Sequence, residues 1–242
     1  MEKLKLRVTG NGQPPILLLH GLGATGAVWD GLAHLLDRRL LIPDLPGHGT
    51  SPRLHNYTFA TLAAAVAETL DEPGPVDVVG HSLGGVVALE LASDLYSLNV
   101  NSVLAIGVKV EWTEDELARA AAMAARPPRL FDTREEAETA YLKVAGLTGL
   151  TTADPDGVVK TPDGWRLALD SPAFGVGSPD MPRLLANAQC PVTLAVGEND
   201  PMSRPEQLRM LASDSVVLPG LGHNAHVEDP AAIAALLAPQ LG

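Results

Sequence analysis

A serine between two glycines is the feature of this chain most typical of nucleophilic catalysis. The segment Gly80-His81-Ser82-Leu83-Gly84 follows the apolar residues 76–79 and precedes the apolar residues 86–92, which contain no glycine or proline. This pattern predicts a strand, a tight turn and a helix. A serine on such an elbow is held in a strained backbone conformation that exposes its Oγ, and small neighbours are needed to avoid collisions. Ser82 is therefore the candidate nucleophile.

Candidates for the base and the acid that Ser82 needs lie further along the chain. A serine hydroxyl needs an imidazole to accept its proton and a carboxylate to fix the tautomer of that imidazole. For a serine on a strand-to-helix elbow, the expected chain order is Ser, then Asp or Glu, then His. Asp200 follows the predicted strand 192–196, and His223 follows the predicted strand 216–218. The order predicts a catalytic triad of Ser82, Asp200 and His223 for acyl transfer to water.

Five motifs in this order resemble those of α/β-hydrolase fold serine hydrolases, in particular esterases. They are residues 17–23 (LLLHGLG), 44–51 (DLPGHGTS), 80–85 (GHSLGG), 196–200 (VGEND) and 222–230 (GHNAHVEDP). The resemblance implies an α/β fold with a mostly parallel central sheet flanked by helices. It also implies an oxyanion hole made by the backbone N–H groups of Leu22 and Leu83. Relatives usually begin with two antiparallel strands, whereas only one is predicted here, so the first strand is expected to be missing or very short.

Two positions of the predicted triad have alternatives. His226 also follows Asp200, but the family pattern places the base directly after a glycine, which favours His223. Glu111 is an alternative acid, because some relatives take theirs from the end of the preceding strand. The ending Gly-x-x-Asp favours Asp200. The pair His223-x-x-His226 has no third ligand at helical spacing, so no metal site is predicted.

Alternating strands and helical stretches predict a mostly parallel sheet with crossover helices. The predicted strands are residues 4–8, 16–19, 40–43, 76–79, 100–108, 192–196 and 216–218. After residue 110 the composition changes, with helix starts near Thr113 and Thr133 and Gly- and Pro-rich sequence from 146 to 182. We expect an α/β-hydrolase core made of residues 1–109 and 189–242, and a helical cap or lid insertion made of residues 110–188.

The cap segment, residues 110–188, is expected to emerge at the carboxyl edge of the sheet, where Ser82, Asp200 and His223 must also converge. It is therefore expected to cover Ser82 and to set the choice of substrate. Its large apolar side chains exceed what a solvated loop needs, although packing of the cap on the core explains any single one equally well. The residues predicted to line an apolar substrate pocket are Trp112, Met123, Phe131, Trp165, Phe174 and Met181.

A second motif is typical of a different class of protein. Residues 21–26 (GLGATG) fit Gly-x-Gly-x-x-Gly after an apolar strand, and Asp44 ends the next predicted strand, as in dinucleotide-binding oxidoreductases. His20 stands where that fingerprint has a small or apolar residue, and an oxidoreductase leaves Ser82 and His223 unexplained. A dinucleotide-binding oxidoreductase is kept as a remote alternative, and no cofactor is predicted.

Composition limits the partners and the location. The chain has 242 residues, a formal net charge of −12 and only 17 lysines and arginines, which argues against nucleic acid or anionic membranes as partners. The single Cys190 excludes an internal disulfide. No secretory segment follows the charged start, and no apolar run reaches the length of a bilayer span. A cytoplasmic protein is expected, and its oligomeric state is left open.

Serine at the elbow narrows the predicted chemistry. Haloalkane dehalogenases and epoxide hydrolases of this family have an aspartate there. Carbon–carbon hydrolases typically have a Trp after the base and an Asn in the elbow, where this chain has Asn224 and His81. The prediction is a serine carboxylesterase that cleaves a small or medium apolar ester through an acyl-enzyme. The alternatives are hydrolysis of an amide, thioester, lactone or activated carbon–carbon bond by the same machinery, and a non-catalytic ligand receptor on the same scaffold.

Overall fold

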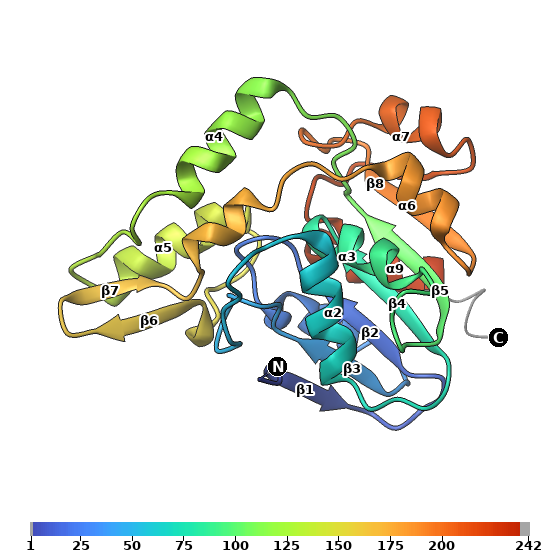
Figure 1. Cartoon of the computed structure of the whole chain (residues 1–242), viewed down its shortest axis with the longest axis horizontal. Coiled ribbons are helices and arrows are strands. Elements are labelled where there is room, and N and C mark those ends of the chain that lie inside the picture. Colours follow the sequence, from blue (N-terminus) through green and yellow to red (C-terminus); the bar gives the residue numbers. More distant parts are fainter. Residues whose placement is uncertain (1, 238–242) are drawn as a thin grey trace.

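A seven-stranded sheet forms the centre of the computed structural model, which describes residues 2–237 (Figure 1). The strand order is β1-β3-β2-β4-β5-β8-β9; β1 runs antiparallel to β3, and the other neighbouring strands are parallel. The strands are β1 (Leu6–Thr9), β2 (Ile16–Leu19), β3 (Leu40–Pro43), β4 (Val76–His81), β5 (Val100–Ile106), β8 (Val192–Gly197) and β9 (Val216–Leu218). The predicted fold class, a mostly parallel sheet flanked by helices, is confirmed.

The strands lie where the sequence predicts them, with shifts of one or two residues at several ends. β1 begins two residues later than predicted, because the amides of Leu4 and Lys5 donate to the side-chain oxygens of Thr69 (3.0 Å) and Ser51 (2.9 Å) rather than to a strand. Within residues 2–15, β1 is the only strand. The sequence predicts one clear strand before β2, and the described residues contain one.

Helices cover both faces of the sheet, because apolar side chains alternate along the buried strands. In β2, Leu17 and Leu19 pack on one face with helices α2, α3, α6 and α7, and Ile16 and Leu18 pack on the other with η1, α1, α8 and α9. Figure 1 shows α2 and α3 in front of the strands. The bounds are η1 (Gly26–Trp29), α1 (Asp30–Ala33), α2 (Phe59–Thr69), α3 (Leu83–Leu91), α6 (Met181–Asn187), α7 (Pro205–Leu211), α8 (Ala225–Glu228) and α9 (Pro230–Leu237).

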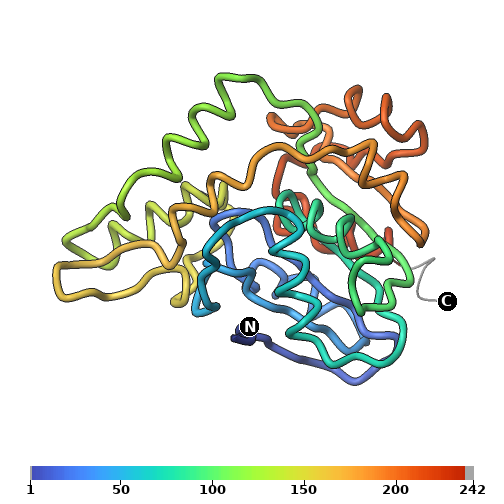
Figure 2. Tube along the Cα trace, in the orientation of Figure 1, coloured from blue at the N-terminus to red at the C-terminus, as the bar shows by residue number. Residues whose placement is uncertain are grey.

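The cap segment leaves the sheet after β5 and returns before β8 (Figure 2). Its helices α4 and α5 begin where predicted, because the side chains of Thr113 and Thr133 accept hydrogen bonds from the amides of Glu116 and Glu136. Figure 1 shows α4, α5 and a hairpin projecting to one side of the sheet. Besides α6, the cap elements are α4 (Glu114–Ala124), α5 (Arg134–Val144), η2 (Pro155–Gly157), β6 (Val158–Thr161), β7 (Gly164–Leu167) and η3 (Ser171–Gly175). The division into core and cap stays a prediction, and residues 238–242 of the predicted core lie outside the described residues.

The β6–β7 hairpin is an element that the sequence analysis missed. Each strand has only four residues, too few for a clear alternation of apolar and polar positions. Contacts from elsewhere in the cap stabilise it: Phe131 and Trp165 exchange two backbone hydrogen bonds of 2.8 Å, and Val158 packs with Tyr141. Pro162 and Asp163 between the strands, followed by Gly164 at the start of β7, were the available sequence signal.

The fold gathers the predicted functional residues at one edge of the sheet. β2, β4, β5, β8 and β9 run in the same direction, so the loops that follow them meet at their carboxyl ends. Ser82 follows β4, Asp200 follows β8, and His223 follows β9. Leu22 follows β2, and the cap segment begins after β5 at the same edge.

Candidate active site

Ser82 lies at a strained turn between β4 and α3. Its φ of 50° and ψ of −113° make it the only non-glycine residue with a positive φ between residues 2 and 237. The flanking glycines are required by space. A Cβ on Gly80 would lie 2.2 Å from the carbonyl oxygen of Gly84, and a Cβ on Gly84 would lie 2.2 Å from that of Leu19. The structure therefore has the strand, turn and helix that the glycine spacing predicts.

His223 and Asp200 form a hydrogen-bonded pair. His223 Nδ1 lies 2.9 Å from Asp200 Oδ2, and Asp200 Oδ1 accepts the amides of Met202 (2.8 Å) and Ser203 (3.1 Å). Asp200 is only 4% exposed, so its carboxylate is fixed in one orientation. Because a carboxylate only accepts hydrogen bonds, His223 Nδ1 carries the proton and Nε2 is left as the basic nitrogen.

Ser82 and His223 line a single cavity of about 300 Å³. Within residues 2–237 no hydrogen bond joins Ser82 Oγ to the His223 ring. Such a bond is often long or poorly aligned in a site without substrate and shortens when substrate binds. The structure thus places both side chains on the wall of one cavity, without a direct hydrogen bond between them.

The two predicted oxyanion-hole residues line the same cavity. Leu22 and Leu83 are both on its wall. Leu83 is the first residue of α3, where a backbone N–H has no partner within the helix. In the described part of the chain, neither the Leu22 amide nor the Leu83 amide donates to another protein atom. Gly21 allows the loop to lie this close, since a Cβ there would be 2.8 Å from His81 Nδ1. Two residues on the wall next to Ser82 therefore have amides without a described protein acceptor.

A row of aromatic rings in edge-on and tilted contact ends at His223. The ring centroids of His223 and His81 are 4.7 Å apart, those of His81 and His226 are 4.3 Å apart, and those of His226 and Trp29 are 4.4 Å apart. His81 Nε2 lies 2.9 Å from the carbonyl oxygen of His223 and must donate to it. Burial, with the neighbouring histidines, lowers the pKa of His81 well below its usual value. The neutral His81 ring therefore holds the main chain of His223, a contact across 142 residues that no sequence signal indicated.

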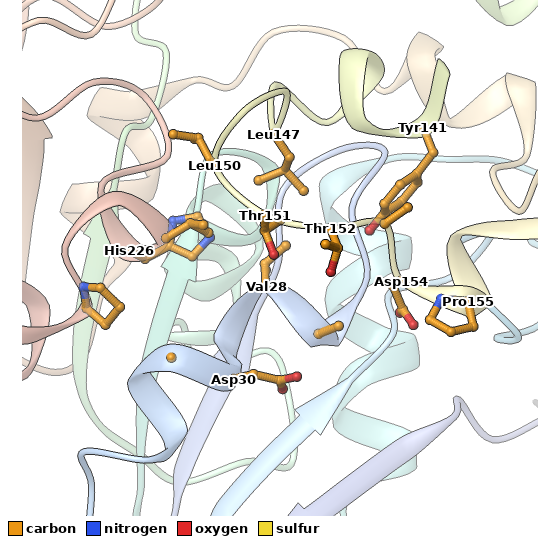
Figure 3. Close-up of a pocket in the computed structure, with 15 residues that line it drawn as sticks. Val28, Asp30, Tyr141, Leu147, Leu150, Thr151, Thr152, Asp154, Pro155 and His226 are labelled. Atoms are coloured by element: carbon orange, nitrogen blue, oxygen red, sulfur yellow. The ribbon is translucent and has the colours of Figure 1, made fainter. Parts of the chain in front are cut away.

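His226, the alternative base, has different surroundings. It is fully buried, burial lowers its pKa to about 3, and neither ring nitrogen has a hydrogen-bond partner. It lines a second cavity of about 350 Å³ between the core and the cap, and not the cavity of Ser82. Figure 3 shows His226 on one side of this second cavity and Tyr141 and Asp154 on the other. The structure pairs Asp200 with His223 alone of these two histidines.

Of the six apolar residues predicted to line the substrate pocket, the structure brings Trp112 to the cavity of Ser82. Other apolar residues of the wall come from core helices, from the end of α5 and from loops that carry no motif, and sequence reasoning missed these. These wall residues are Phe59, Val86, Val144, Val176 and Met202.

The other five predicted pocket residues lie elsewhere. Met123 is 39% exposed on α4. Phe131 and Trp165 pack together in an apolar cluster of the cap. Phe174 and Met181 pack against the main core. Packing of the cap on the core, the other explanation of these side chains, accounts for Phe174 and Met181, whereas Phe131 and Trp165 pack within the cap itself.

Glu111, the alternative acid, and Asp44, the candidate ribose ligand of an oxidoreductase, both bind other residues of the protein. The carboxylate of Glu111, the alternative acid, accepts a hydrogen bond from Gln207 and has no bond to His223. Asp44, the candidate ribose ligand, is 4% exposed and accepts the Gly26 amide at 2.8 Å. The glycine-rich loop leads into η1 and the four-residue α1, and not into a long helix whose N-terminus would hold a pyrophosphate.

The comparisons with known proteins agree on the type of fold. The model of the alpha/beta hydrolase family matches residues 16–236. A solved E-2-(acetamidomethylene)succinate hydrolase superimposes with a TM-score of 0.80 and 27% identity, covering 97% of this chain and 94% of that one. An esterase from Thermogutta terrifontis superimposes with a TM-score of 0.72 and 23% identity, covering 98% and 92%.

Curated proteins match over shorter stretches. A pimeloyl-[acyl-carrier protein] methyl ester esterase of Methylococcus capsulatus is 43% identical over 91 residues, which is 37% of this chain and 35% of that protein. Lipase LipV of Mycobacterium tuberculosis is 43% identical over 86 residues, 34% of this chain and 33% of that protein. The matched region thus spans about a third of the length of these relatives. Within residues 2–237, no helix has the length and apolar character needed to cross a bilayer.

Proposed function

Because the chain belongs to the alpha/beta hydrolase family, we propose that it is a serine hydrolase that cleaves a carboxylic ester of a small or medium, largely apolar substrate. Ser82 is the nucleophile, His223 is the base, and Asp200 orients His223. The observation that carries the proposal is that the strained Ser82 and the Asp200-paired ring of His223 line one cavity.

In the first half of the reaction, Ser82 Oγ attacks the ester carbonyl carbon while His223 Nε2 takes the hydroxyl proton. The amides of Leu22 and Leu83 donate to the developing oxyanion, the type of contact that strengthens most in the transition state. The Asp200 carboxylate holds the proton on Nδ1 and stabilises the imidazolium that forms. The tetrahedral intermediate then expels the alcohol, which takes its proton from His223, and leaves an acyl group on Ser82.

In the second half, water replaces the alcohol and the same groups act in the same order. His223 Nε2 takes a proton from water, the resulting hydroxide attacks the acyl carbon, and the two amides again hold the oxyanion. Collapse of this intermediate breaks the bond to Ser82, returns the proton from His223 to Oγ and releases the carboxylic acid. One ester and one water give one acid and one alcohol, and no step needs a cofactor.

The names of the curated relatives favour an ester, and the cavity wall favours an apolar acyl chain. The two curated relatives described above are by name a methyl ester esterase and a lipase, matched over part of their length. The apolar wall of Phe59, Val86 and Val144 suits an acyl chain, and burying one methylene there contributes about 0.8 kcal/mol. An amide, thioester, lactone or activated carbon–carbon bond would use the same residues, so these bonds belong in the substrate panel.

We further propose that the cap segment, residues 110–188, covers the site and sets substrate choice. Trp112 and Val144 reach the cavity from the cap. The cap also contacts the loop that supplies the Leu22 amide: Thr25 Oγ1 donates to Asp154 Oδ2 at 2.5 Å, and a Cβ on Gly23 would lie 2.7 Å from Val144. Movement of the cap would therefore move one of the two oxyanion donors.

The proposal is tested by labelling and by turnover. A fluorophosphonate is expected to modify Ser82, as located by peptide mass spectrometry. The protein is expected to hydrolyse p-nitrophenyl esters in a panel of graded chain length that also holds an amide, a thioester and a lactone. Ser82→Ala should lower kcat by about 10⁴-fold or more, because removal of one member of a catalytic unit disables the whole unit.

The matched control is Ser93→Ala, which removes a serine hydroxyl just after the C-terminus of α3; among the described residues this hydroxyl bonds only to the Glu90 carbonyl, at 2.8 Å. This variant should keep both labelling and turnover. Wild-type turnover in a folded Ser82→Ala protein would exclude the mechanism. Ligand binding with no turnover of any ester, amide, thioester or lactone would instead favour a receptor.

A further inference from the structure

The fixed charges on the wall of the Ser82 cavity are all positive. Lys109 and Lys143 are on that wall, and among the described residues that line it there is no aspartate or glutamate. The whole chain has the opposite balance, with 29 acidic residues against 17 basic ones. A wall with two lysines and no carboxylate therefore departs from the rest of the molecule, and it does so at the cavity where the proposed reaction occurs.

Lys143 is the more available of the two cations. It lies in the last turn of α5, is exposed, and forms no ion pair or hydrogen bond with any described residue. The positions three and four residues away on the helix, which a side chain can reach, are Thr139, Ala140, Gly146 and Leu147, all uncharged. The same helix pairs its other cation, since Arg134 Nε lies 2.7 Å from Glu138 Oε1. Lys143 also lines a neighbouring pocket with Asp132 and Glu136, but its ammonium forms no ion pair with either, so its charge is not neutralised by direct contact with a described carboxylate.

Lys109 supplies a second charge that is partly neutralised. Its ammonium is paired with the carboxylate of Glu116 and lies 4.9 Å from the centroid of the Trp112 ring. The hydrogen bond from Lys109 lowers the pKa of Glu116 to about 2, so the Glu116 carboxylate stays ionised at neutral pH. Glu116 is not on the cavity wall. Lys109 therefore contributes positive potential to the cavity, but less than Lys143.

We propose that Lys143, assisted by Lys109, forms an anion-binding subsite of the Ser82 cavity, and that the preferred ester carries a carboxylate or phosphate group in addition to the scissile bond. The inference rests on the proposed function. The apolar wall holds the carbon chain next to Ser82. The anionic group then lies nearer to solvent, where the long lysine side chains can contact it. A point charge on a flexible side chain suits either anion, so the shared chemistry is a negative group at a distance from the ester.

The anionic group has two places in an ester, and matched substrate pairs distinguish them. Monomethyl adipate against methyl hexanoate places a carboxylate on the acyl side, and 4-acetoxybenzoate against 4-methylphenyl acetate places one on the leaving-group side. For each pair the measured quantity is the ratio of kcat/KM for the anionic ester to that for the neutral ester. In one of the two pairs, we expect the ratio for the wild type to be about twofold to fivefold higher than the ratio for Lys143→Gln. This factor corresponds to the free energy of an exposed ion pair.

The matched control is Lys160→Gln, which removes a lysine of the β6 strand in the cap, outside the lining of the Ser82 cavity. It should leave both ratios unchanged. Lys143→Glu should lower the ratio further than Lys143→Gln, and Lys109→Gln should lower it in the same pair. Raising the salt concentration to about 0.5 M should reduce the wild-type ratio, since exposed charges are screened.

A different role for Lys143 predicts a different result. A lysine in the last turn of a helix also stabilises the helix through its dipole. In that case Lys143→Gln would lower the unfolding temperature and change both members of a pair equally, and equal ratios in the wild type, Lys143→Gln and Lys143→Glu would overturn the subsite. Hydrolysis of the neutral esters by the wild type tests the proposed function separately. A failure of charge preference is therefore distinct from a failure of ester hydrolysis.

Discussion

Replacement of Ser82 by glycine and by alanine should separate its catalytic role from its backbone strain. Both variants remove Oγ, so both are expected to lose ester hydrolysis. They differ in the backbone. The φ of 50° is unfavourable for any residue with a Cβ, and alanine keeps that Cβ whereas glycine does not. No hydrogen bond from Ser82 Oγ to another described residue is lost in either variant. The difference in stability between them therefore reports the strain.

The magnitude follows from two opposing terms. Relief of the strained backbone is worth about 1–3 kcal/mol, and the greater freedom of glycine in the unfolded chain costs about 0.5–1 kcal/mol. Ser82→Gly should then be more stable than Ser82→Ala by about 1 kcal/mol. For a chain of 242 residues this corresponds to a rise in unfolding temperature of about 2–4 °C.

The assay is thermal unfolding of both variants by calorimetry, with circular dichroism to show that the fold is kept. The control pair is Ser93→Gly and Ser93→Ala, because Ser93 has a negative φ and glycine there should be the less stable substitution. Opposite signs at the two serines are the expected result. An unfolding temperature of Ser82→Gly at or below that of Ser82→Ala would refute the argument that the elbow is strained.

Two further outcomes are expected from the histidines. His223→Ala should lose as much turnover as Ser82→Ala. His226→Gln should keep most of it, because His226 does not line the Ser82 cavity and its ring nitrogens have no hydrogen-bond partner among the described residues. The reverse pattern in steady-state kinetics would reassign the base. Burial lowers the pKa of His20 to about 4 and that of His226 to about 3, so below about pH 6.5 the unfolded chain binds protons that the folded chain does not. The free energy of unfolding should therefore fall from pH 6.5 toward pH 4, by up to about 1.4 kcal/mol per pH unit for each histidine. Urea unfolding at pH 7 and pH 5 measures this, and equal values would contradict it.

The parts of the fold that the sequence predicted are those set by local patterns. Continuous apolar runs predicted β2, β3 and β9 to the residue; β2 and β3 are fully buried, and β9 is the partly buried strand at the edge of the sheet. The glycines around Ser82 leave a direct trace in the sequence, because any Cβ at Gly80 or Gly84 would collide with backbone atoms. Thr113 and Thr133 mark helix starts through their own side-chain hydrogen bonds.

The wall of the candidate site was beyond such patterns, because it depends on which face of each element meets its neighbour. Trp112 and Trp165 are both large apolar residues of the cap, yet one reaches the Ser82 cavity and the other packs against Phe131. Nothing in the residues adjacent to either tryptophan distinguishes the two outcomes. Phe59 and Val86 reach the cavity from helices whose other apolar residues fill the core. Residue type predicted that these side chains avoid full exposure to solvent, but not which neighbours they pack against.

The same distinction explains why chemistry is easier to predict here than substrate choice. The proposed chemistry needs particular atoms on Ser82, Asp200 and His223, so those positions admit few residue types and form motifs. Substrate choice needs only a shape and a potential, which many residues provide from many elements. Lys143 illustrates this: in the sequence it is one lysine near the end of a helix, and only the folded chain shows that it lines the Ser82 cavity, whose described wall has no carboxylate. A substrate class for such a protein is therefore better inferred from the charges around the cavity than from the motifs that build its reactive centre.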